Sequence, residues 1–433
     1  MKKLYKYITF IVLFILFLLF NLIISPLNLD EIWSYGFSYN IVNGLIPYKD
    51  FNMVITPFYP ILMALFLKIN HSILFFHIIN ALIPTCILFI AHKLIKEKVF
   101  IILPLLIFPL NITFPNYNIF LLLLFILLIY LEKNNKNDLL IGVLLSLIFL
   151  TKHTVGLFLV PVSLYYLKDK KKIFKRLITF LIPVIIFIFY LLITKSLNSF
   201  IDLCILGLFD FGKGNTSINI FFYITIFLLV VLLLLIKDNK KIDYYYLLTF
   251  ISICIPLFDL YHVQIYLIAY LIILFMNNNK LFKPKLVGIT LFIGLLSIYI
   301  IKCNFNTKYY PNKLNLFEYK YISKNSINNT NEVIKYMNKY NNKVMFIGPN
   351  AYYYKLITKQ KINDLDLINT GNFGYNGSNK LLKRVKNLDK DYVFFVNKDE
   401  IGYGKQTDQK LIKYIIKNYQ KIDEISSYNI YKK

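Results

Sequence analysis

Residues 177–194 read LITFLIPVIIFIFYLLIT without one charged side chain, and residues 168–176 just before them read KDKKKIFKR. An apolar run of about 18 to 20 residues is long enough for a helix to cross the hydrocarbon core of a bilayer. Lysine and arginine collect on the cytoplasmic side of membrane helices. This stretch therefore predicts a membrane-spanning helix whose N-terminal end faces the cytoplasm.

Similar apolar runs continue on both sides of this segment. The 433 residues are 57% hydrophobic and 17% charged, and the runs lack the alternation or single stripe of soluble elements. We predict an all-α polytopic membrane domain over residues 1–302 with about eleven transmembrane helices. The net charge of +26 then reflects lysine-rich loops and not nucleic-acid binding. The predicted spans are 7–24, 72–91, 99–114, 117–131, 139–151, 155–167, 177–194, 220–236, 244–258, 261–276 and 286–301.

Five basic clusters determine the predicted topology. The first apolar run lacks a small-x-small cleavage site, so we interpret it as an uncleaved anchor with a cytoplasmic N-terminus. All five clusters are then cytoplasmic only if the apolar run 57–69 does not span. We predict that this run is an interfacial or re-entrant helix within a first outer loop at 25–71. The clusters are Lys93, Lys96 and Lys98; Lys133 and Lys136; residues 168–176; Lys237, Lys240 and Lys241; and Lys280, Lys283 and Lys285.

The chain changes character at residue 303 and becomes polar and rich in asparagine and lysine. Strand-like runs at 343–347, 392–396 and 429–431 alternate with helix-like runs at 331–340, 378–388 and 408–419. This order predicts a small α/β domain over 303–433 with a partly parallel sheet, outside the cell by the same parity. Gly371, Gly374 and Gly377 lack the spacing of a phosphate-binding loop and favour a glycine-rich turn.

The first outer loop has the most informative polar residues. It contains the adjacent acids Asp30 and Glu31, the only tryptophan, Trp33, and the turn Pro47-Tyr48-Lys49-Asp50. A short helix is expected after Asp30, and an ordinary helix cap accounts for an acid at that position. The alternative is a cluster, beside the outer membrane surface, that binds an amphiphilic ligand.

The order of these motifs resembles a known family. An acidic pair after the first helix, then Gly44-Leu45-Ile46-Pro47-Tyr48-Lys49-Asp50-Phe51 and the Pro57-led apolar run, is similar to the C-type (GT-C) glycosyltransferases, which include protein O-mannosyltransferases and aminoarabinose transferases. The resemblance implies transfer of a sugar from a polyprenyl-phosphate donor to a glycan, lipid or protein acceptor at the outer face. It also implies that Asp30 is the general base, with Glu31 either orienting the acceptor or serving the structure. Trp33, Tyr48, Lys49 and Asp50 are then candidate substrate-binding residues.

The phosphate leaving group needs cationic donors in the same cavity, because its charge grows as the glycosidic bond breaks. Lys49, Lys152, His153, Lys213 and His262 lie on connections predicted to be outside. Lys152 and His153 interrupt an apolar stretch, where a charge is costly unless it is paired or functional, although snorkelling to the headgroups is an alternative for Lys152. Asp259 and His262 form a short turn that is either a substrate-binding or a purely structural element.

Other features narrow the alternatives. Asn116 and Asn118 stand where many family members have a second acid, so no cofactor is indicated, and a divalent cation at Asp30 or Glu31 is left open. The cysteines lack the spacing of a zinc site.

A flippase for lipid-linked saccharides would need mid-helix charges or repeated halves, which we do not find. An O-antigen-type polymerase and a non-catalytic envelope protein are further alternatives. We expect an integral protein of the plasma membrane, with membrane lipid among its partners.

Overall fold

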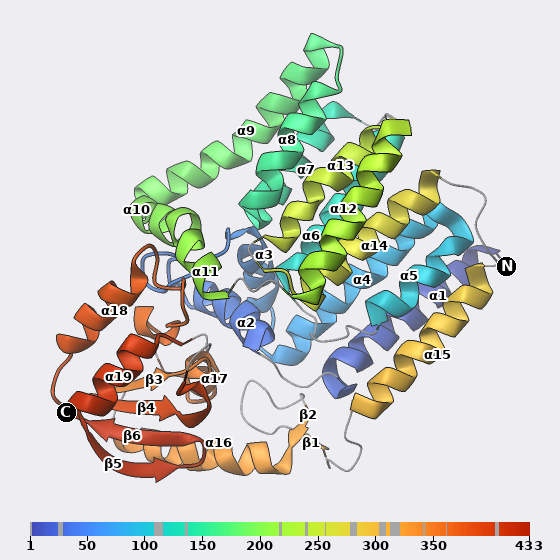
Figure 1. Ribbon diagram of the computed structural model, residues 1–433. Helices are drawn as coiled ribbons and strands as arrows, with labels where there is room; N and C mark the ends of the chain where they lie inside the picture. Colours follow the sequence, from blue (N-terminus) through green and yellow to red (C-terminus); the bar gives the residue numbers. More distant parts are fainter. Residues whose placement is uncertain are drawn as a thin grey trace.

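The computed structural model describes residues 2–24, 29–107, 116–134, 137–215, 219–238, 241–255, 257–277, 284–302, 309–311, 321–340, 343–360, 362–402 and 407–433. It consists of a large helical part and a smaller C-terminal part built on a sheet (Figure 1). Several predicted features lie outside the described residues: the start of the first loop at 25–28, the end of the 99–114 run, the boundary at 303, and Lys136, Lys240, Lys280 and Lys283.

The helical part contains the expected succession of apolar helices. Short 3-10 or π-helical segments continue some of them, namely η1 (Phe20–Ile24), η2 (Lys96–Lys98), η3 (Ile201–Leu206) and η4 (Ile251–Cys254). The helices are α1 (Lys2–Leu19), α2 (Leu29–Val42), α3 (Phe58–Leu67), α4 (Ile73–Ile95), α5 (Val99–Ile107), α6 (Tyr117–Lys133), α7 (Asp138–Thr151), α8 (His153–Tyr165), α9 (Lys170–Ile193), α10 (Leu197–Phe200), α11 (Gly207–Asn215), α12 (Ile220–Asp238), α13 (Ile242–Phe250), α14 (Leu260–Asn277) and α15 (Pro284–Lys302).

Three helices among the described residues are long and apolar enough to cross a membrane, namely Ile73–Ile107, Lys170–Ile193 and Leu260–Asn277. The predicted count of about eleven is therefore not supported. The reason is helix length: α7 and α8 have 14 and 13 residues, or about 20 Å each, whereas the hydrocarbon core is about 30 Å thick. Further apolar helices of 10–17 residues are Ile8–Leu22, Phe58–Leu67, Asp138–Thr151, His153–Tyr165, Ile220–Ile236 and Ile242–Cys254.

The apolar run predicted not to span is the short helix α3. Its 10 residues extend about 15 Å, half the thickness of a bilayer core. Tyr59, Met63 and Leu67 are buried, because α3 packs against α2, α4 and α7. Its position relative to a membrane stays a prediction.

The segment 195–215, which follows the predicted span at 177–194, is largely helical. It contains α10, η3 and α11 in succession. Leu203 and Cys204 are buried, and the Cys204 thiol lies 3.4 Å from the carbonyl oxygen of Met53. Gly207, Gly212 and Gly214 lower the helix propensity of this segment, so tertiary packing overrides local propensity here.

Several of the basic clusters meet at one end of the helices. The Lys98 ammonium donates to the carbonyl oxygen of Phe275 at 2.9 Å, and the Lys241 ammonium donates to Asn277 Oδ1 at 3.1 Å. Lys133, Lys172 and Lys241 line a common cavity. Which side of a membrane this end faces stays a prediction.

The C-terminal part contains the predicted mixed sheet. The strands β3 (Val344–Ile347), β4 (Val393–Asn397), β6 (Tyr428–Lys432) and β5 (Gln420–Ile425) pair in that order, with β3 and β4 parallel and the other pairs antiparallel. The predicted strands and helices are confirmed, whereas β5, α17 and the β1–β2 hairpin had no sequence prediction. The remaining elements are β1 (Tyr309–Pro311), β2 (Tyr321–Ser323), α16 (Lys324–Met337), α17 (Ala351–Ile357), α18 (Gly377–Lys386) and α19 (Gln409–Asn418).

The two parts pack against each other at two places. On α2, a Cβ on Gly36 would lie 2.4 Å from the Tyr352 ring of α17, and Phe37 meets the same ring edge-on at 5.7 Å. The glycine-rich turn forms the second contact, because a Cβ on Gly374 would lie 2.2 Å from the Asp202 carboxylate. Gly374 also has a φ of +78°, which favours glycine.

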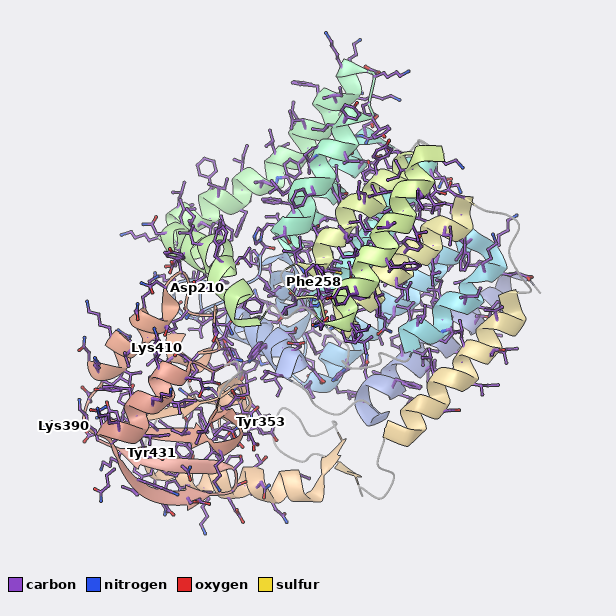
Figure 2. The ribbon with its side chains drawn as sticks, viewed as in Figure 1. Asp210, Phe258, Tyr353, Lys390, Lys410 and Tyr431 are labelled. Atoms are coloured by element: carbon purple, nitrogen blue, oxygen red, sulfur yellow. The ribbon has the colours of Figure 1, made fainter. Side chains whose placement is uncertain are left out.

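Carboxylates of the helical part bind the glycine-rich turn. Asp202 accepts hydrogen bonds from the backbone N–H of Tyr375 at 3.2 Å and from the Lys380 ammonium at 2.6 Å. Asp210, which Figure 2 labels where α11 faces the C-terminal part, accepts from the backbone N–H of Asn376 at 2.5 Å. The glycine-rich segment is a turn, as the sequence favoured, and it also serves as a docking element, because its backbone donors hold carboxylates of the chain itself.

Candidate functional site

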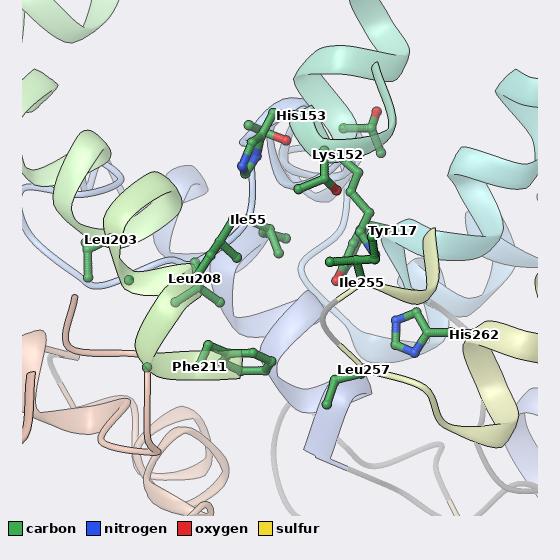
Figure 3. Close-up of a pocket in the computed structure, with 16 residues that line it drawn as sticks. Ile55, Tyr117, Lys152, His153, Leu203, Leu208, Phe211, Ile255, Leu257 and His262 are labelled. Atoms are coloured by element: carbon green, nitrogen blue, oxygen red, sulfur yellow. The ribbon is translucent and has the colours of Figure 1, made fainter. Parts of the chain in front are cut away.

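A cavity lies where α7 breaks into α8, next to α11 and the start of α14 (Figure 3). It encloses about 600 Å³, including its open mouth. Most of the wall is apolar, but Lys152, His153 and His262 also line it. These are three of the five cations that the sequence analysis singled out. The other lining residues are Val54, Ile55, Thr56, Tyr117, Thr151, Thr154, Leu203, Gly207, Leu208, Phe211, Ile255, Leu257 and Gly371.

Lys152 occupies the break between α7 and α8. Its φ and ψ of −149° and 98° are extended, so the helix ends at Thr151 and a new one starts at His153. Its ammonium donates to the carbonyl oxygen of Ile253 at 2.8 Å. Among the described residues no carboxylate lies within 4.0 Å of it, and burial lowers the pKa of Lys152 to about 8. Lys152 is therefore a half-buried cation without an ion-pair partner in the described part of the chain.

His262 belongs to a hydrogen-bonded chain at the start of α14. Asp259 Oδ1 accepts from the His262 backbone N–H at 2.8 Å and lies 2.7 Å from Nδ1 of the same ring. The other ring nitrogen, Nε2, lies 3.3 Å from the Asn118 amide. A carboxylate on Nδ1 fixes the ring orientation and places the proton there. Burial raises the pKa of Asp259, but the His262 contacts outweigh it, and the net pKa is lowered.

Asp30 lies in the first turn of α2, which begins at Leu29 and not after Asp30 as predicted, and it is half-buried. Burial, followed by the nearby charge of Asp259, raises the pKa of Asp30 to about 6. Asp30 also interacts electrostatically with Tyr117 and Tyr261, and Tyr117 lines the cavity. Asp30 itself does not line the cavity, and its electrostatic interaction with Tyr117 is its link to the cavity wall.

Glu31, next to Asp30 in sequence, is fully buried and faces away from the cavity. Its Oε1 lies 2.7 Å from Nε2 of His77 on α4, and both side chains are 0% exposed. Nearby, the Tyr59 hydroxyl donates to Asn80 Oδ1 at 2.7 Å. The Glu31–His77 contact therefore joins α2 to α4, and a direct contact between Glu31 and a ligand in this cavity does not fit that position.

The other residues singled out in the first loop are structural in their contacts. Trp33 is half-buried against the core. The Tyr48 hydroxyl donates to the carbonyl oxygen of Ile55 at 2.6 Å, and Asp50 Oδ2 accepts from the Ile46 backbone N–H at 2.7 Å. Lys49 is exposed and does not line the cavity. The Pro47–Asp50 turn thus supports the cavity wall from behind, through Ile55.

Several lining residues had no sequence prediction. Leu208 and Phe211 come from α11 and Gly371 from the glycine-rich turn, and their approach depends on how the C-terminal part docks. Asn116 and Asn118, noted only as replacements for an acid, link α6 to α14. Asn116 Oδ1 accepts from the Tyr261 hydroxyl at 2.5 Å. Conventional motifs do not include such amides, so their role becomes visible only in the structure.

No group of three or more His, Cys, Asp or Glu side chains placed to hold a metal ion occurs in the described part of the chain. No protein-family model, no curated protein and no solved structure matches this sequence.

Proposed function

We propose that the protein transfers a sugar from a polyprenyl-phosphate donor to an acceptor at the outer face of the plasma membrane. One observation carries this proposal: an apolar-walled cavity lined by a half-buried lysine whose ammonium has no carboxylate partner among the described residues. The natural complement of such a site is an amphiphilic anion. A polyprenyl phosphate combines an apolar chain with a phosphate and meets both requirements.

Lys152 has the role of stabilising the departing phosphate. A buried ammonium costs several kcal/mol unless an anion offsets the lost hydration. A bound phosphate supplies that anion, and its charge increases as the glycosidic bond breaks, so the interaction is strongest in the transition state. His153 and His262, which share the cavity, are further donors to the phosphate oxygens.

Asp30 has the role of general base, and Glu31 holds its helix in place. With a pKa of about 6, Asp30 is ionised at neutral pH and still a better proton acceptor than an ordinary aspartate. Tyr117 and Asp259 connect its position electrostatically to the cavity. We expect the acceptor hydroxyl or amine to reach Asp30 past Tyr117.

The proposed membrane placement follows from the charges. The basic clusters that meet near Phe275 and Asn277 mark the cytoplasmic end. Asp138, at the N-terminal end of α7, belongs to the charged cavity at that end, and Lys152 follows the C-terminal end of the same helix, so the candidate site opens to the outside. The N-terminus is then cytoplasmic, and the soluble part over 303–433 is extracytoplasmic.

Mass spectrometry of cell-envelope glycans tests the proposal. A strain without the gene is complemented with the wild type, with Asp30→Asn or with the exposed control Asp389→Asn. We expect one saccharide to disappear without the gene, to return with the wild type and the control, and to fall at least about 100-fold with Asp30→Asn. An unchanged glycan profile in the deletion strain would refute the transferase function, and full activity of Asp30→Asn would refute the base.

A further inference from the structure

A second cavity lies on the C-terminal part, between the glycine-rich turn, α18 and the start of α19. It encloses about 950 Å³, including its open mouth. Neutral polar side chains dominate its wall, together with one partly buried aromatic ring, Phe373. The lining residues are Asp210, Ile368, Asn369, Thr370, Gly371, Phe373, Asn376, Gly377, Ser378, Leu381, Thr407, Asp408 and Gln409.

We propose that this cavity, named here the polar cleft, binds a neutral or amine-bearing saccharide chain. As part of the proposed transfer reaction, and resting on it, that saccharide is the acceptor. Asparagine, threonine and serine side chains each offer both donors and acceptors, as the hydroxyl groups of a sugar do. Phe373 adds an apolar ring face that suits the C–H face of a pyranose.

The charge of the described wall of the polar cleft disfavours an anionic ligand. None of the described lining residues is a lysine, arginine or histidine, whereas Asp210 and Asp408 contribute carboxylates. A phosphate or an acidic sugar would meet repulsion without a compensating cation. On α18, the Lys380 ammonium is bound to Asp202 of the helical part. Neutral hydroxyls and protonated amines are the groups that this wall complements.

In the wall of the polar cleft, the buried atoms Ser378 Oγ and Asp408 Oδ2 have no hydrogen-bond partner among the described residues. The other Asp408 oxygen, Oδ1, caps α19 by accepting from the backbone N–H of Lys410 at 2.8 Å. The cap fixes the carboxylate, so Oδ2 is held in one place without a further cost in side-chain entropy. Buried polar atoms in this state gain most from a ligand hydroxyl.

The polar cleft adjoins the cavity around Lys152. Gly371 lines both. On α11, Asp210 lines the polar cleft while its neighbour Phe211 lines the Lys152 cavity. A saccharide chain in the polar cleft therefore ends near the proposed donor site, as an acceptor must.

Direct binding tests the polar cleft without relying on transfer. The labelled full chain in nanodiscs is applied to an array of neutral, amine-bearing and acidic oligosaccharides. We expect binding to neutral or amine-bearing members and none to acidic ones. Asp408→Asn keeps the helix cap, because asparagine caps as well as aspartate, but it should weaken binding about 10-fold. Phe373→Leu should weaken it several-fold, and Asp389→Asn should leave it unchanged.

The outcomes separate the two proposals. Binding lost in Asp408→Asn and kept in Asp30→Asn supports the polar cleft whatever the deletion strain shows. The protein could bind glycans while deletion of its gene leaves the envelope glycans unchanged. That result would refute the proposed transferase function and still support saccharide binding by the polar cleft. Three results would overturn the polar cleft as a saccharide site. They are no binding to any array member, a preference for acidic members, and binding by Asp408→Asn and Phe373→Leu that equals binding by the wild type.

Discussion

Two cations lie near opposite ends of α7, Arg176 buried and Lys152 half-buried, and their surroundings differ. Arg176 is 4% exposed and donates to both oxygens of Glu132 at 2.5 and 2.9 Å and to Asp138 at 2.7 Å. Ser163 Oγ accepts a further hydrogen bond from it at 2.7 Å. Lys152, about 20 Å away along the helix, has only the Ile253 carbonyl oxygen among the bonds described.

This contrast separates a structural cation from the one that we propose to bind a ligand. Arg176 has a bidentate carboxylate partner, which satisfies its planar fork, so nothing is left for a ligand to offset. Lys152 lines an apolar-walled cavity. The cost of removing a charge from water is offset by the chain at Arg176, and in our proposal it is offset by the ligand at Lys152.

The largest expected effect is on stability, at Arg176. Replacement by methionine leaves Glu132 and Asp138 buried without their cation, and we expect a loss of about 3–5 kcal/mol in the free energy of unfolding. Chemical unfolding of the purified protein in detergent measures it. Lys175→Met, one residue earlier and exposed, is the control and should change little. Equal stability of the two variants would refute the structural role of Arg176.

The next effect concerns Asp30 and pH. Its pKa rises from 3.8 unfolded to about 6 folded, so the folded state binds the proton more tightly. Stability from this group is therefore present at pH 4 and is lost as pH rises through 6, by at most about 3 kcal/mol. We expect Asp30→Asn to be more stable than the wild type at pH 8 and to approach it near pH 4. Transfer by the wild type should increase as pH rises through 6.

Unfolding curves of both proteins at pH 4, 6 and 8 test this expectation. The informative quantity is the difference in free energy of unfolding between the wild type and Asp30→Asn, because the other titrating groups are the same in both proteins. A difference that stays constant with pH would mean that Asp30 has an ordinary pKa and no special suitability as a base.

The sequence predicted the parts of the site that depend on local contrast. Lys152 and His153 were recognisable because they interrupt an apolar run, and the Asp259–His262 turn because it is short and polar. The strands at 344–347 and 393–397 were recognisable from their apolar runs. In each case the signal lies within a few residues of the feature.

The sequence could not predict what depends on distant packing. Glu31 and His77 form a buried pair across 46 positions, and nothing near either residue indicates the other. The helices at 197–215 form because they pack between the first loop and the glycine-rich turn. The count of about eleven spans failed because hydropathy reports the composition of a run, whereas its ability to cross depends on unbroken helix length.

A smaller effect is expected at Lys152. Replacement by methionine removes a half-buried charge that lacks a carboxylate partner in the described residues, so stability should stay the same or increase slightly. Binding of a photoactivatable polyprenyl phosphate should weaken about 10- to 100-fold. Cross-linking followed by peptide mapping measures it, with Lys152→Arg expected to restore part of the affinity. Unaltered labelling of the Lys152→Met variant would rule out this lysine as the phosphate contact.

The smallest effect isolates burial from pairing. Lys380 lies 2.6 Å from Asp202, as close as Arg176 is to its carboxylates, but the two side chains are 45% and 32% exposed. Water offsets the loss of either partner, so Lys380→Met should cost at most about 1 kcal/mol. The unfolding assay used for Arg176→Met measures this variant too. A comparable loss of stability in both variants would show that contact distance determines how much each cation contributes to stability. We expect burial to govern them, because only a cation removed from water requires a partner, supplied by the chain or by a ligand.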